Sequence, residues 1–214
     1  MQEKEAKPIN TKRLYKVALN LAIFTIVYNI IEGYVSTYFG YEDESLTLFG
    51  FGADSFIEAI SALGIAHMIL RIQNKTKEKP NNFEHKALRI TAYAFYTLVI
   101  MLTTTAIYNL WTAHKPNTTL WGVIISVISI SVMWVLLYNK TKIGKQLNSA
   151  AILADAECTR VCIYMSIILL VSSGIYELTN FPYIDSIGTL GLAYFSFKEG
   201  KECFENAKSK NTVL

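Results

Sequence analysis

The chain has 214 residues, of which 52% are hydrophobic and 17% are charged, and its net charge is +3. Positions 90–114 and 116–139 contain no Asp, Glu, Lys or Arg, and each run is long enough to cross a hydrocarbon core of about 30 Å as a helix. A soluble fold has no use for two such runs. Three cysteines are too few for the disulfide framework of a small secreted protein. The scattered lysines also do not form the basic face of a nucleic-acid-binding protein. Because the sequence has no phosphate-binding glycine loop, nucleophile elbow or His-Glu-x-x-His pattern, we expect no enzyme.

Apolar runs bounded by charged residues predict six membrane-spanning segments. Their approximate bounds are Leu14 to Tyr38, Leu46 to Arg71, Leu88 to Trp111, Leu120 to Tyr138, Ser149 to Ile175, and Ile184 to Glu205. All six should be helices, because lipid offers no hydrogen-bond partner to an unpaired backbone amide. The sequence therefore predicts an all-α integral membrane protein with an N-terminal segment at 1–13, a transmembrane domain at 14–205 and a short tail at 206–214.

The basic residues gather on one side of the predicted membrane. The chain up to Lys16, the second-to-third and fourth-to-fifth connections with the span ends beside them, and the chain from Lys198 onward together hold 18 of the 20 Lys and Arg residues. By the positive-inside rule this asymmetry predicts that both termini are cytoplasmic, and we expect a plasma (inner) membrane location. In this assignment Lys140 belongs to the fourth-to-fifth connection, and Arg160 is the only basic residue inside a span.

A few ionisable residues fall inside the predicted spans, where a charged side chain costs at least about 2.5 to 3.5 kcal/mol. They are Glu32 in the first span, Asp54 and Glu58 in the second, and Asp155, Glu157 and Arg160 in the fifth. Glu177 and Asp185 are expected at the outer ends of the fifth and sixth spans, near water. Each residue inside a span is a candidate for function unless a structural partner explains it.

Two groups of these residues have the spacing of a metal site. Asp54 and Glu58 are four residues apart, so they lie on one face of a helix. Asp155, Cys158 and Cys162 share one face of the fifth span. Counting residues from the span ends places both groups at a similar depth. Two carboxylates and two thiols form a four-ligand set for a tetrahedral divalent ion.

Structural explanations compete with this interpretation. A cysteine in an apolar helix is more often a small buried hydrophobe than a ligand, and the i, i+4 spacing of Cys158 and Cys162 opposite a carboxylate pair favours the ligand role. Alternatively, Asp54 and Glu58 form a carboxylate pair that serines or tyrosines of neighbouring helices satisfy.

Other polar residues have simpler explanations. Glu157 and Arg160 are three residues apart and are expected to neutralise each other as an ion pair. Glu32 is expected either to join that pair or to line the pathway, and no role is assigned to Cys203. The three histidines, His67, His85 and His114, are expected to be solvated or interfacial.

Three motifs resemble the transmembrane domain of the cation diffusion facilitator (cation efflux) family. They are Ala-Asp-Ser-Phe-Ile-Glu at 53–58, Ala-Asp-Ala-Glu-Cys-Thr-Arg-Val-Cys at 154–162 and Tyr-Ile-Asp-Ser-Ile-Gly at 183–188. The resemblance covers nearly the whole chain. It implies export of divalent metals such as zinc from the cytoplasm by homodimers, usually in exchange for protons. The family's second-span ligands, an Asp or His and an Asp four residues on, match Asp54 and Glu58.

The fifth span departs from the family pattern, which places a His and an Asp four residues apart there. If Asp155 matches the Asp that precedes these ligands, Cys158 takes the His position and Cys162 the Asp position, whereas a shifted alignment uses Asp155 and Thr159. Thiolates favour zinc, cadmium or another soft ion over manganese or magnesium. The family's cytoplasmic metal-binding and dimerising module is expected to be lacking after the sixth span.

The sequence therefore predicts a protein that is embedded in the lipid bilayer and exports a divalent metal. Zinc is the favoured substrate, protons are the exchanged ion, no other cofactor is expected and a homodimer is the expected assembly. The alternative is a non-transporting membrane sensor or accessory subunit that uses the same ligands. A redox enzyme using Cys158 and Cys162 is a third interpretation, although thiols four residues apart on one helix rarely reach disulfide geometry.

Overall fold

The computed structural model describes residues 11–73, 82–112 and 115–209, which form six α-helices and no strand. The helices are α1 (Thr11–Glu42), α2 (Leu46–Gln73), α3 (Asn82–Thr112), α4 (Leu120–Leu147), α5 (Ala150–Thr179) and α6 (Ile184–Ser209). Since each has 26 to 32 residues, each is longer than the roughly 30 Å of a hydrocarbon core. The all-α prediction is confirmed for this part of the chain. The helices extend past the predicted spans, most clearly at α4.

A two-residue connection reverses the chain between α4 and α5. Asn148 has a left-handed backbone with φ of 48°, and its N–H donates to the carbonyls of the last turn of α4. The side chain of Ser149 then accepts a hydrogen bond from the N–H of Ile152 at the start of α5. Asn tolerates the left-handed region better than most residues, and Ser is a favoured N-cap. These two residues therefore make α4 and α5 antiparallel neighbours.

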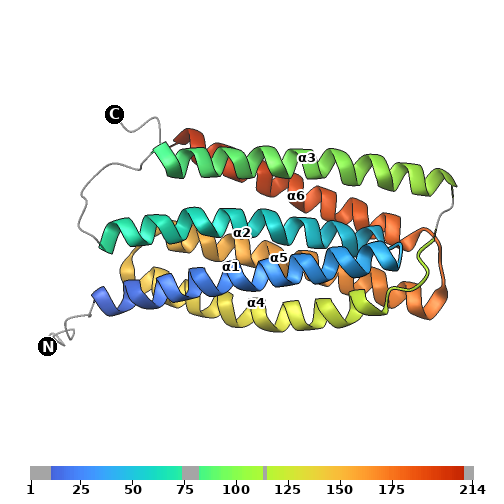
Figure 1. The fold of residues 1–214 in the computed structure, drawn as a ribbon, viewed down its shortest axis with the longest axis horizontal. Helices are drawn as coiled ribbons and strands as arrows, with labels where there is room; N and C mark the ends of the chain where they lie inside the picture. The colour runs from blue at the N-terminus through green and yellow to red at the C-terminus, as the bar shows by residue number, and fades with distance from the viewer. Residues whose placement is uncertain (1–10, 74–81, 113–114, 210–214) are drawn as a thin grey trace, which may run out of the picture.

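The six helices pack as a four-helix group and a pair. Helices α1, α2, α4 and α5 form the group, and α3 lies along α6 beside it (Figure 1). Helices α2 and α5 contact members of both parts, so they lie at the centre. Helix α1 begins and α6 ends at the same end of the bundle (Figure 1), which we call the α1-start end; α5 also begins there.

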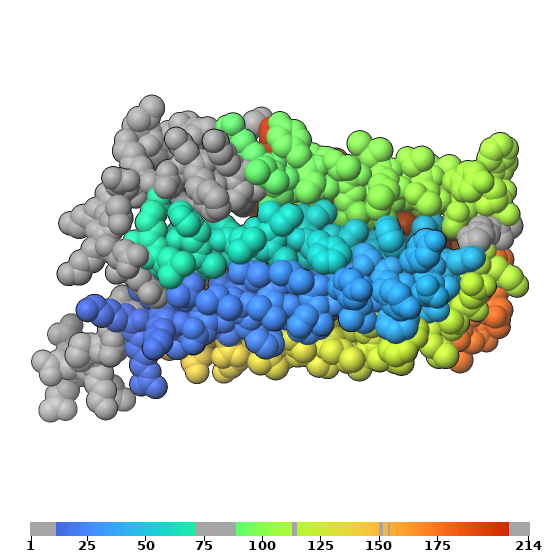
Figure 2. Space-filling model, viewed as in Figure 1, coloured from blue at the N-terminus to red at the C-terminus, as the bar shows by residue number. Residues whose placement is uncertain are grey.

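Hydrophobic side chains cover the outside of the bundle as well as its interior. Ile31, Ile100 and Trp134 are each at least 59% exposed, and Figure 2 shows the long surface that α1, α2 and α3 present on one face. Inside, Phe51 and Leu169 belong to the largest cluster of buried apolar residues. An apolar exterior of this extent fits contact with lipid, which does not penalise exposed hydrocarbon.

Five helices contain a segment long and apolar enough to cross a membrane. These segments are Lys12–Glu42, Leu46–Arg71, Arg89–Thr112, Leu120–Leu147 and Asp155–Thr179. Helix α6 is of similar length but less apolar and is not among them, so the sixth span stays a prediction. Of the predicted terminal segments, residues 1–10 and 210–214 lie outside the described part of the chain.

Asp185 ties the start of α6 to the start of α2. Its carboxylate accepts hydrogen bonds from the hydroxyl of Ser45 at 2.7 Å and from the backbone N–H groups of Leu46 at 2.8 Å and Thr47 at 3.3 Å. Asp185 is 3% exposed, so the expectation that water lies near it is wrong. The first N–H groups of a helix lack intrahelical partners and carry partial positive charge. The carboxylate is stable there because it supplies both the acceptor and the opposite charge.

Close packing of α1 on α2 depends on Gly52. A Cβ atom at this position would lie 2.6 Å from the backbone nitrogen of Thr37, and only movement of the helices could relieve that contact. We therefore expect Gly52→Ala to lower the free energy of unfolding by about 1 to 3 kcal/mol, seen as a lower melting temperature of the detergent-solubilised protein. Gly174→Ala is the matched control, because its Cβ would meet nothing within 4 Å. Equal melting temperatures for the two variants would contradict this account of the packing.

Candidate metal centre

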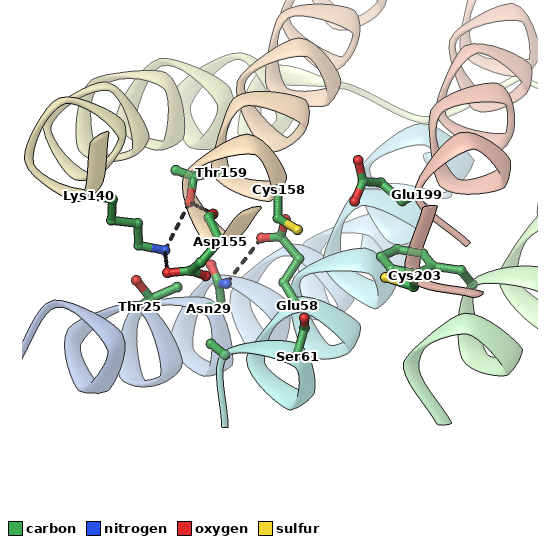
Figure 3. A pocket seen from close by; sticks show the side chains of 12 residues that line it. Thr25, Asn29, Glu58, Ser61, Lys140, Asp155, Cys158, Thr159, Glu199 and Cys203 are labelled. Atoms are coloured by element: carbon green, nitrogen blue, oxygen red, sulfur yellow. Dashed lines mark hydrogen bonds and ion pairs between the residues drawn. The ribbon is translucent and has the colours of Figure 1, made fainter. Parts of the chain in front are cut away.

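Side chains from all six helices line one narrow cavity (Figure 3). Its polar and charged lining includes Asn29, Glu58, Lys140, Asp155, Cys158 and Glu199. The cavity extends from the middle of the bundle, where Asn29 and Glu58 lie, toward the α1-start end, because Asp155 is only five residues into α5, or about 8 Å along its axis. The space open to the centre of a water molecule is about 20 Å³, which is room for one water or one bare metal ion.

Glu58 connects the two predicted halves of the site. The Cys162 thiol of α5 donates a hydrogen bond to Oε1 of Glu58, and Nδ2 of Asn29 donates to Oε2 at 3.1 Å. A carboxylate of α2 and a thiol of α5, 104 residues apart in sequence, therefore meet in the middle of the bundle. Carboxylate oxygen and thiol sulfur are both zinc ligands.

Asp155 is held by a buried lysine. Nζ of Lys140 lies 2.9 Å from Oδ2 of Asp155 and donates to the hydroxyl of Thr159 at 2.9 Å (Figure 3). The side chains of Lys140 and Asp155 are 2% and 11% exposed. Asp155 therefore lines the cavity as predicted, but its charge is already neutralised by an ammonium group.

Asp54 lies outside the cavity lining. It is 3% exposed, and its Oδ1 has no hydrogen-bond partner within the described residues. A helical rise of 1.5 Å per residue places Asp54 about 6 Å from Glu58 along α2, away from the α1-start end. An unpartnered carboxylate oxygen in an apolar interior is costly. Asp54 is thus a candidate for binding a cation or a proton in another arrangement of the helices.

The five predicted ligands are brought near one another but are not gathered into a finished site. Glu58, Asp155 and Cys158 line the cavity and Cys162 contacts Glu58, whereas Asp54 lies beyond it. Across residues 11–73, 82–112 and 115–209, no three His, Cys, Asp or Glu side chains are close enough together to hold a metal ion. Metal binding at these residues therefore requires side chains to move.

Lys140 corrects two predictions. From its sequence, Lys140 was expected in a cytoplasmic connection, and Arg160 was expected to be the only basic residue inside a span. In the structure α4 continues to Leu147, and Lys140 is buried on its inner face. The predicted span ended at the first charge, whereas a charge paired inside a bundle does not end a helix. The buried positions Met133, Leu136, Lys140 and Ile143 follow the helical repeat, a signal that the sequence already contained.

Two residues of α6 that line the cavity were not predicted as site residues. Glu199 and Cys203 are each 5% exposed and line the cavity. They are four residues apart, the same spacing as Asp54 and Glu58, and this repeat is the signal that could have found them. Figure 3 shows both approaching the cavity from the side opposite Lys140.

The structure tests some of the predictions for the remaining ionisable residues. Arg160 and Glu157 form the expected ion pair, with 2.6 Å between Nη1 and Oε2. Glu32 accepts hydrogen bonds from Tyr28 at 2.8 Å and Ser55 at 3.0 Å, so it does not join that pair. The predictions for the side chains of His85 and His114 fall outside the described residues.

Comparison with known families agrees with this architecture. The Cation efflux transmembrane domain matches residues 21–209 of the chain. The chain therefore belongs to the cation efflux family, and the resemblance drawn from its motifs is confirmed. Its class is that of multi-pass membrane proteins that transport cations, which agrees with the expectation of no enzyme. A search of curated proteins gave no match.

The cavity predicts an order of reactivity for the three cysteines. Cys158 and Cys203 both line the cavity, but Cys158 is half-buried and Cys203 is buried, and Cys162 is buried against Glu58. In variants that retain one cysteine each, we expect a small water-soluble methanethiosulfonate to label Cys158 at least several-fold faster than the other two. Mass spectrometry of the labelled protein measures these rates. Faster labelling of Cys162 would show that the cavity does not reach α5 at Cys158.

Proposed function

We propose that this protein exports a divalent transition-metal cation from the cytoplasm in exchange for protons. Zinc is the favoured substrate, and cadmium or another soft ion is the alternative cargo. The proposed ligands are Asp54, Glu58, Asp155, Cys158 and Cys162. The protein would lie in the plasma (inner) membrane as a homodimer with both termini cytoplasmic and α6 as its sixth span.

The observation that carries this proposal is the contact between Glu58 and Cys162. It joins the acidic face of α2 to the thiol face of α5, as a site with mixed carboxylate and thiolate ligands requires. Hard oxygen and soft sulfur ligands together suit zinc and its heavier relatives. Membership of a cation-transporting family supports transport rather than storage.

The cavity supports an inward-facing arrangement. It extends toward the α1-start end, where the positive-inside rule places the cytoplasm. Helix α6 supports a sixth span because it lies along α3 and exposes apolar side chains such as Ile187 at 52% and Tyr194 at 65%. A cation from the cytoplasm would first meet Asp155, Cys158 and Glu58. It would contact Asp54 only after the helices move to open the other end.

Proton exchange follows from the chemistry of the ligands. Thiols and carboxylates bind metal in their deprotonated forms, so loading a cation releases protons. When the site opens to the other side and the metal leaves, the same groups take up protons again. Alternating exposure of one site to the two sides would then couple metal export to proton return.

Metal flux in reconstituted vesicles tests this function. Proteoliposomes with an acidic interior should take up zinc and cadmium, because protons leaving the vesicle drive the metal inward. We expect Asp54→Ala to reduce this uptake at least tenfold and leave the protein folded. Glu42→Ala is the matched control, since it removes a carboxylate that is exposed in the structure.

The contrary outcomes separate the alternatives. Unchanged flux in Asp54→Ala would remove this residue from the site. Zinc binding without flux in the wild type would favour a sensor or accessory subunit. Zinc protection of Cys158 and Cys162 from alkylation would support a ligand role, whereas labelling that depends only on a reductant would favour redox chemistry.

A further inference from the structure

The ion pair between Lys140 and Asp155 places a fixed positive charge at the proposed metal site. Nζ of Lys140 lies 2.9 Å from a carboxylate oxygen of Asp155 and 2.9 Å from the hydroxyl of Thr159. All three residues line the cavity that Glu58 also lines (Figure 3). The ammonium group therefore occupies the place at Asp155 that a divalent cation would take.

An ammonium group and a divalent cation compete for Asp155 in this cavity. The interior is poorly polarisable, so two positive charges a few ångströms apart repel strongly. The space open to a water centre is only about 20 Å³. Binding of a metal ion at Asp155 therefore weakens the contact between this carboxylate and the ammonium group.

Asn29 offers a place for the displaced ammonium. Its Nδ2 donates to Glu58, while its Oδ1 is buried and has no hydrogen-bond partner within the described part of the chain. Asn29 lines the same cavity as Lys140. The side chain of lysine has a flexible four-carbon stem and three donors, which suits it to exchange one acceptor for another inside the cavity.

We propose that Lys140 is a tethered internal cation that holds Asp155 while the cavity is empty and leaves it when a divalent cation binds. This inference rests on the proposed function. Lys140 then weakens metal binding by competing for a ligand, which favours release. It also keeps the carboxylate neutralised during the return of the empty transporter.

Competition of this kind has a measurable consequence. If Asp155 is free of Lys140 for about a tenth of the time, the apparent metal affinity is about tenfold weaker than the intrinsic one. Lys140→Met removes the charged amino group and keeps an unbranched side chain that is one heavy atom shorter. We expect this variant to bind zinc about tenfold more tightly in calorimetric titration of the detergent-solubilised protein, and to show a lower KM for zinc flux.

Two further variants make the test specific. Lys142→Met removes an exposed lysine from the same helix and should leave zinc affinity unchanged. In the Asp155→Asn background, Lys140→Met should no longer tighten binding, because the shared carboxylate is gone. A lysine with a merely structural role would instead give lower stability with unchanged or weaker zinc binding, and that result would overturn the proposal.

A measurement on the wild type covers the case in which Lys140→Met does not fold. Reductive methylation should modify Lys140 faster at saturating zinc than without zinc, while Lys142 reacts equally in both. An equal rate of methylation of Lys140 with and without zinc would overturn the proposal that zinc displaces its ammonium group from Asp155. Wild-type protein that neither binds nor transports zinc would instead refute the proposed function, so the two failures are distinguishable.

Discussion

Hydrocarbon supplies neither counter-charge nor hydrogen bond, so the charged groups at the centre of this protein take their partners from other side chains inside the bundle. Lys140 and Asp155 neutralise each other between α4 and α5, and Glu58 takes its donors from α1 and α5. Removing one partner from a buried pair costs about 3 to 5 kcal/mol. These contacts therefore fix which faces of the central helices point inward, and the cavity is a result of that choice.

The charges of the cavity are not fully matched. Glu58, Asp155 and Glu199 contribute carboxylates, and Lys140 is the one basic residue among the lining side chains. Buried acid in excess over base attracts cations and protons, because either restores neutrality where water is scarce. The same imbalance allows the two kinds of cation to replace each other. In the proposal above, the divalent cation replaces the Lys140 ammonium group in this way.

The two ends of the bundle differ in how they are held. At the end opposite the α1 start, Asp185 accepts the first N–H groups of α2, and Glu177 accepts from the hydroxyl of Thr118 at 2.8 Å. The small cavity lies away from that end and extends toward the α1 start as far as Asp155. Hydrogen bonds between helices therefore hold the end opposite the α1 start, whereas the polar cavity lies in the other part of the bundle.

Helical periodicity was sufficient to predict part of the site. The four-residue spacings in α2 and α5 placed Asp54 beside Glu58 and Cys158 beside Cys162, and the three-residue spacing paired Glu157 with Arg160, because neighbours on a helix face are set by local geometry. Lys140 escaped prediction because its partner Asp155 is on another helix. The four-residue spacing of Glu199 and Cys203 marks a face of α6, but this spacing does not show that the face turns toward α5.

Hydropathy, charge distribution and short-range spacing are local properties of the chain, so they were enough to predict the all-α membrane protein and its family motifs. Which carboxylate lacks a partner and which is neutralised became visible only in the packed bundle. That distinction depends on the rotation of each helix against its neighbours, which sets whether Lys140, Asn29 or Cys162 faces a given acid. A local pattern can show that such a residue faces inward, but not which side chain of another helix it meets.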